Sequence, residues 1–72
     1  MLTNITAKLG DELFFDGLDS IASAIRFLSI SRSALYSLME RGELPYVKIG
    51  KSRRIPHRAL VELASRHLVV SR

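Results

Sequence analysis

The 72-residue sequence predicts a small α+β domain that is mostly helical, with three short helices and a two-stranded β-hairpin. Apolar residues recur at helical spacing within residues 20–28, 32–41 and 58–68. Residues 46–55 instead alternate between apolar and polar around Gly50, and Pro45 and Pro56 bound this stretch. A chain of this length forms one domain with a modest hydrophobic core.

Charge is distributed unevenly along the chain. Residues 1–19 contain one lysine and four acidic residues, a net charge of 1 − 4 = −3, whereas residues 20–72 contain ten basic and three acidic residues, 10 − 3 = +7. We therefore expect an acidic N-terminal extension over residues 1–17, a basic domain over residues 18–68 and a short tail over residues 69–72. The basic domain suits a polyanionic partner.

The N-terminal extension has no clean hydrophobic period, and its one dense apolar cluster is Leu13, Phe14 and Phe15. Two interpretations of this cluster are open. Either it packs on the core as a short strand or turn, or it contacts another protomer or protein, with its two aromatic rings as the anchors.

The first two helices are predicted to form a helix-turn-helix. Asp19 or Ser20 can cap the first helix, and about three residues separate its end from Ser31, which can cap the second. So short a connection permits only a change of direction, although an ordinary helical hairpin would show the same periods. The apolar face of the first helix consists of Ile21, Ala24, Ile25 and Leu28.

The second helix is predicted over residues 32–41, and it ends where Gly42 can adopt the left-handed conformation. Its apolar stripe consists of Ala34, Leu35, Leu38 and Met39. Its opposite face is polar and consists of Arg32, Ser33, Tyr36, Ser37 and Glu40.

A basic hairpin follows the second helix. Residues 46–49 and 53–55 are the predicted strands, residues 50–52 are the turn, and Val47 and Ile49 are expected on the buried face. No acidic residue lies between positions 46 and 58. Such a run of cations is either a solvated strand edge protected from aggregation or a surface for a polyanion. Its basic residues are Lys48, Lys51, Arg53, Arg54 and Arg58.

The third helix is predicted over residues 58–68, with a stripe of Leu60, Leu63, Ala64 and Leu68 facing the core. His57 and His67 lie ten residues apart at its two ends. They cannot ligate one metal from a single helix face, so we interpret them as residues that begin and end the helix.

Several functional classes are disfavoured by composition. Without cysteine, the chain can form neither a disulfide framework nor a thiolate metal site. Its apolar runs are too short for a signal peptide or a membrane span, so we expect a cytoplasmic protein with no membrane partner. We find no histidine near a paired carboxylate, no glycine-rich phosphate loop and no acid pair in an apolar setting. We therefore predict no catalytic residue, no metal, no cofactor and no enzyme activity.

Three short motifs together carry a family resemblance. Ser31-Arg32-x-x-Leu35-Tyr36, then Arg41-Gly42-Glu43-Leu44-Pro45, then Val47-x-Ile49-Gly50, resemble the small winged helix-turn-helix domain of phage excisionases. The resemblance covers about residues 18–67. It implies that the second helix enters the major groove of DNA and that the hairpin, or wing, reaches the adjacent minor groove. Excisionases, also called recombination directionality factors, share this domain with small regulators of the MerR type, and family members often carry an aromatic residue at the position of Arg53.

The chemistry of the residues predicts which side chains contact double-stranded DNA. Arg32 can bind guanine in bidentate fashion or hold a phosphate, and Tyr36 either shares that contact or packs partly against the wing. Lys51, Arg53 and Arg54 suit a narrow minor groove, while Lys48 and Arg58 suit phosphates. The predicted contacts of the second helix are Ser31, Arg32, Ser33, Tyr36 and Ser37. Those of the wing and its flanks are Lys48, Lys51, Ser52, Arg53, Arg54 and Arg58.

One short helix and one wing read only a few base pairs, so a single copy would discriminate poorly between sequences. Only residues 69–72 follow the third helix, which is too short for a dimerising coiled coil. The leading hypothesis is a phage excisionase whose copies bind adjacent sites head to tail, bend the DNA and direct a phage integrase toward excision. The alternatives are a small MerR-like transcription regulator on the same surface, and a protein adaptor that uses the Leu13 cluster.

Overall fold

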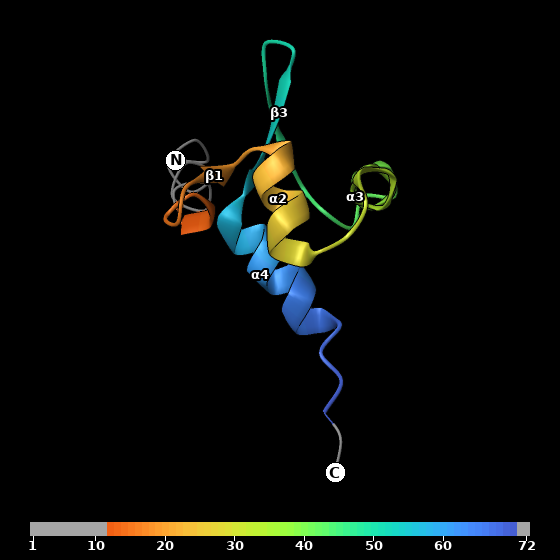
Figure 1. Cartoon of the computed structure of the whole chain (residues 1–72). Coiled ribbons are helices and arrows are strands. Elements are labelled where there is room, and N and C mark those ends of the chain that lie inside the picture. The colour runs from red at the N-terminus through yellow and green to blue at the C-terminus, as the bar shows by residue number, and fades with distance from the viewer. Residues whose placement is uncertain (1–11, 71–72) are drawn as a thin grey trace.

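The computed structural model describes residues 12–70 and confirms a small α+β fold of the winged helix-turn-helix kind (Figure 1). Residues 1–11 of the predicted extension and residues 71–72 of the predicted tail lie outside the described part. Figure 1 shows the β2–β3 hairpin projecting away from the helices. The elements are β1 (Leu18–Asp19), α2 (Ile21–Leu28), α3 (Arg32–Glu40), β2 (Val47–Ile49), β3 (Ser52–Pro56) and α4 (His57–Arg66).

The sheet has three antiparallel strands in the order β1-β3-β2, and not the two of the predicted hairpin. The additional strand β1 pairs Leu18 with Pro56 and Asp19 with Ile55. Two residues are too few to show an alternating pattern, so the sequence carries no sign of this strand. Its effect is to attach the segment before α2 to the base of the wing.

Serine caps define the starts of the first two helices, as the sequence predicts. The Ser20 hydroxyl accepts a hydrogen bond from the backbone N–H of Ser23, and the Ser31 hydroxyl accepts one from Ala34, both at 3.1 Å. The helix α3 ends at Glu40, one residue before the predicted end, and Gly42 has the expected positive φ of 76°. The histidines also lie where predicted, since His57 begins α4 and His67 caps its C-terminal end.

The turn between α2 and α3 contains a strained residue. Ser29 caps the C-terminal end of α2 in the left-handed conformation, with a φ of 55°, and its backbone N–H donates to the carbonyl of Ile25. A side chain with a Cβ atom adopts this conformation at a cost of about 1 to 2 kcal/mol. Ser29 lies in the turn that determines the angle between α2 and α3, so its strained conformation is part of the helix-turn-helix geometry.

Replacing Ser29 with glycine should therefore raise the free energy of unfolding by about 0.5 to 1 kcal/mol, since glycine adopts a positive φ without steric penalty. Urea denaturation followed by circular dichroism measures the change. The matched control is Ala22→Gly within α2, which should lower the stability by about 1 kcal/mol. If both substitutions changed the free energy of unfolding in the same direction, the left-handed conformation of Ser29 would not be a source of strain.

Every helix, the wing and the loop before it contribute to one hydrophobic core. Ile55 comes from β3, Leu44 from the segment before β2, and the remaining residues from the three helices. The fully or nearly buried apolar side chains are Ala24, Leu35, Met39, Leu44, Ile55, Ala59, Leu60 and Leu63.

Three residues of the predicted helices that were expected to face this core are exposed instead, namely Ala34, Ala64 and Leu68. The buried face of α4 passes through Ala59 and Leu60, close to where the helix begins. The helix α4 ends at Arg66, two residues before the predicted end, so Leu68 lies beyond it, and Figure 1 shows the far end of α4 running past the other elements. Helical periodicity identifies a shared face but does not tell how far that face is covered.

The buried face of the wing also differs from the prediction. Directly opposite residues on paired strands share a face, and Lys48 lies opposite Arg53. Arg53 in turn shares its face with Ile55, which is fully buried, so this face meets the core at Ile55. Val47 is only half-buried and Ile49 is 57% exposed, because both lie on the other face or near the turn.

Candidate nucleic-acid interface

The N-terminal half of α3 presents a polar, hydrogen-bonding surface. Ser31, Arg32, Ser33 and Ser37 are exposed, and Tyr36 is half-buried. The start of α3 carries the positive end of the helix dipole and free backbone N–H groups, which favours an anion such as a phosphate. Ser31, Arg32 and Ser33 are thus accessible together at the start of α3, and Ser37 is accessible past its middle.

The tip of the wing is basic and exposed. Lys48 lies in β2, Lys51 lies in the turn with Gly50, and Ser52 follows as the first residue of β3. Gly50, with a φ of 61°, allows the tight reversal. Ile49 adds an exposed apolar side chain beside these cations. It was not among the predicted contact residues because it was expected on the buried face of the hairpin. The tip can therefore offer both charge and apolar surface to a groove.

Arg53, predicted to contact DNA, is held within the protein. Its guanidinium carbon lies 5.1 Å from the ring centroid of Tyr36 in α3 and 4.6 Å from that of Tyr46. Its Nη1 atom lies 3.6 Å from a carboxylate oxygen of Glu40, and its side chain is only 25% exposed. The packing interpretation of Tyr36 is consistent with this arrangement, since the tyrosine ring contacts the wing.

Arg54 points to the opposite side of the strand from Arg53. It is partly buried, and its Nη1 donates a hydrogen bond to the backbone carbonyl of Arg53 at 3.1 Å. This bond leaves other guanidinium N–H groups available, because arginine has five donors. Arg54 therefore differs from Arg53 although the two are neighbours in sequence.

Arg58 is engaged by the segment that precedes β1. Its Nε lies 3.6 Å from a carboxylate oxygen of Asp16, and its guanidinium carbon lies 5.6 Å from the ring centroid of Phe15. The cluster of Leu13, Phe14 and Phe15 is not a strand: Leu13 is helical and half-buried, and Phe14 and Phe15 lie exposed in the turn that follows. The acidic segment thus partly neutralises a cation that would otherwise suit a phosphate.

The structure contains a histidine–carboxylate pair that the sequence did not reveal, since His57 was interpreted there only as a residue that begins the helix. His57 Nδ1 lies 2.7 Å from Asp19 Oδ2, and the ring of Phe27 meets the imidazole edge to face at a centroid distance of 4.9 Å. The backbone N–H of His57 also donates to the carbonyl of Gly17. Asp19 and His57 are 38 positions apart in the sequence, which leaves no local signal, and the pair joins β1 to α4.

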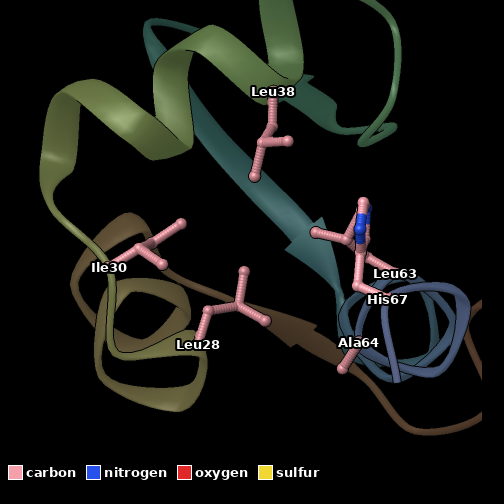
Figure 2. A pocket seen from close by; sticks show the side chains of 6 residues that line it. All are labelled: Leu28, Ile30, Leu38, Leu63, Ala64 and His67. Atoms are coloured by element: carbon pink, nitrogen blue, oxygen red, sulfur yellow. The ribbon is translucent and has the colours of Figure 1, made fainter. Parts of the chain in front are cut away.

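An open apolar groove lies beside the ends of the three helices (Figure 2). Figure 2 shows side chains from α2, from the following turn, from α3 and from α4 directed toward one space. Beyond α4 the chain continues as three exposed apolar residues, Leu68, Val69 and Val70, which are 72%, 84% and 76% exposed. The groove is lined by Leu28, Ile30, Leu38, Leu63, Ala64 and His67.

Two consecutive helices joined by a short turn, followed by a projecting basic hairpin, define a winged helix-turn-helix domain. A family model described as a helix-turn-helix domain matches residues 20–68, and the chain belongs to this family. It is a DNA-binding domain found in excisionase-like and MerR-like proteins, and is typical of regulators that are not enzymes. Comparisons with curated proteins and with solved structures give no match. Within residues 12–70, no helix is long and apolar enough to cross a membrane.

Proposed function

We propose that the protein is a phage excisionase, which binds DNA at adjacent sites and directs an integrase toward excision in the bacterial cytoplasm. The observation that carries the proposal is the pairing of an exposed, hydrogen-bonding start of α3 with a projecting wing whose tip is basic. In this arrangement α3 reads the major groove and the wing enters the minor groove. An inserted wing widens or bends DNA, which is the architectural action that recombination needs.

The accessible polar residues are the proposed DNA contacts. Arg32 contacts a guanine or a phosphate, and the neighbouring serines donate to phosphate oxygens. Lys48 and Lys51 contact the backbone or the minor groove, and Arg54 supports them. Arg58 contacts a phosphate once Asp16 releases it. The remaining proposed contacts are Ser31, Ser33, Tyr36, Ser37 and Ser52.

Self-association on DNA is the second part of the proposal. A single copy reads few base pairs, so specificity requires several copies side by side. The exposed tail of Leu68, Val69 and Val70 and the apolar groove beside α4 support this, since each copy carries both an apolar projection and an apolar recess. Seating the tail of one copy in the groove of the next would bury both and give a head-to-tail row.

A small transcription regulator is the second candidate, because the same helix-turn-helix family includes MerR-like proteins. Such a regulator would use the same DNA surface but would act by blocking or recruiting RNA polymerase. It needs neither adjacent copies nor an integrase, so the number of copies on DNA and the bend distinguish the two functions.

The test is a gel-shift titration on circularly permuted duplexes that carry a site selected from a random pool by the protein, at two salt concentrations. We expect a cooperative ladder of complexes whose mobility depends on the position of the site. Replacing Val69 and Val70 with serine should remove the ladder but keep the first complex. The matched control is Val61→Ser, an exposed valine on α4 outside the tail.

A single complex with position-independent mobility would contradict the excisionase function and favour the regulator. Binding that does not weaken with salt would contradict contact with the phosphate backbone. A reconstituted recombination reaction that ignores the protein would contradict the partnership with an integrase.

A further inference from the structure

We infer that Arg53 is a positioning residue, which fixes the angle of the wing against α3 and does not itself contact DNA. The inference rests on the proposed DNA contact of the wing. It assigns to this cation a role different from that of the other basic residues of the hairpin. Its evidence is the set of partners that surround the guanidinium group.

Arg53 connects two elements that are separate in sequence. Tyr36 and Glu40 lie one turn apart on the same face of α3, while Tyr46 lies just before β2. The guanidinium is within 5.1 Å and 4.6 Å of the two tyrosine ring centroids, and 3.6 Å from Glu40. Both cation–π contacts fall within the range of attraction, which is about 6 Å. The group therefore joins α3 to the base of the wing.

The strand register explains why this arginine, and not its neighbour, has this role. Arg53 shares the inward face of β3 with the fully buried Ile55, whereas Arg54 occupies the other face. Lys48 lies directly opposite Arg53 on β2. Two cations facing each other across a strand pair repel, so the tyrosines and the carboxylate around Arg53 offset a local electrostatic cost.

The same surroundings make Arg53 unsuited to a phosphate. Its side chain is only 25% exposed, and the carboxylate of Glu40 stands beside it. Glu40 would repel a phosphate that approached the guanidinium. One nitrogen, Nη1, is buried without a hydrogen-bond partner among the described residues. Moving Arg53 out to reach DNA would require it to give up both tyrosine rings.

A positioning role has a consequence for the tip of the wing. Lys51 lies in the turn beyond β2 and is well exposed. If Arg53 fixes the direction of the hairpin, Lys51 reaches DNA only while Arg53 is in place. The contributions of the two residues to DNA affinity are then coupled, and the control below separates this coupling from the mere closeness of two residues that lie two positions apart.

The experiment is a double-mutant cycle with a fluorescent duplex selected from a random pool by the wild-type protein. In the wild-type background, Lys51→Ala should weaken binding by about fivefold and lower the salt dependence by about one ion. In the Arg53→Ala background, we expect the same Lys51 substitution to change affinity by less than about twofold. Arg53→Ala alone should weaken binding by about tenfold, in protein shown by circular dichroism to be folded.

Arg53→Met is the control that separates position from charge. Methionine has no charge but fills a similar space and makes favourable contacts with aromatic rings. We expect Arg53→Met to bind DNA within about threefold of wild type and to keep the full effect of Lys51→Ala.

If Arg53→Met and Arg53→Ala were equally weak and the Lys51 effect were the same in every background, Arg53 would be a direct DNA contact and the inference would be overturned. A wild-type protein that selected no duplex would refute DNA contact by this chain. A protein that bound without bending would refute only the excisionase function and leave the role of Arg53 intact.

Discussion

Replacing Leu35 with alanine should lower the free energy of unfolding by about 2 to 5 kcal/mol. Leu35 is fully buried in the centre of the face that α3 turns to the core, so the substitution leaves a cavity that the neighbouring side chains fill only in part. A core of this size contributes a net stability of about 3 to 5 kcal/mol. The variant should therefore be largely unfolded at 37 °C, which urea and thermal denaturation followed by circular dichroism would measure.

The matched control is Leu38→Ala, one turn further along the same helix. Leu38 is half-buried and lines the open groove, so its truncation should cost only about 1 to 2 kcal/mol. The same substitution in the same helix then separates burial from helix propensity. If Leu38→Ala were as costly as Leu35→Ala, the groove would be filled in solution, and the tail or another copy would have to cover it.

Features that depend on neighbouring residues could be predicted from the sequence. The serines at 20 and 31 accept hydrogen bonds from backbone N–H groups three residues ahead, so each cap and the helix after it form a local unit. Gly42 ends α3 for an equally local reason, since it adopts a positive φ. The three helices and the hairpin followed from such signals.

Features that depend on distant residues could not be predicted in this way. The strand β1 is defined by its pairing with the distant β3, and the contact of Asp19 with His57 likewise joins residues far apart in the sequence. Alternation in the hairpin showed which residues share a face. It did not show which face meets the core, and the burial of Ile55 decides that question against Val47 and Ile49.

In the candidate site, too, the local features could be predicted from the sequence and the tertiary contacts could not. The polar face of α3 was predictable because helical spacing separates it from Leu35 and Met39. The accessibility of each cation could not be predicted, because a count of basic residues cannot show that Arg53 faces two tyrosines or that Arg58 faces Asp16. Charge composition indicated the partner, and the tertiary packing selects which cations are free to meet it.

Arg32→Ala should give the largest loss of specific DNA affinity of any single substitution among the exposed residues of α3. Arg32 is the first residue of α3 and is exposed, where it can bind a guanine through two hydrogen bonds. Loss of such a pair costs about 1 to 3 kcal/mol, which is a factor of about 5 to 150 in affinity. Fluorescence anisotropy with a selected duplex, and with a duplex of scrambled sequence, would measure both the affinity and its specificity.

Arg32→Lys distinguishes base contact from phosphate contact, because lysine keeps the charge but lacks the planar pair of donors. For a guanine contact, the lysine variant should bind scrambled DNA as wild type does and lose most of its preference for the selected site. Arg41→Ala at the other end of α3 is the matched control, since Arg41 pairs with Glu43 at 3.0 Å, and its effect on specificity should be less than about twofold. Equal losses on both duplexes for Arg32→Ala, with full rescue by lysine, would make Arg32 a phosphate contact and transfer sequence reading to Tyr36 and Ser37.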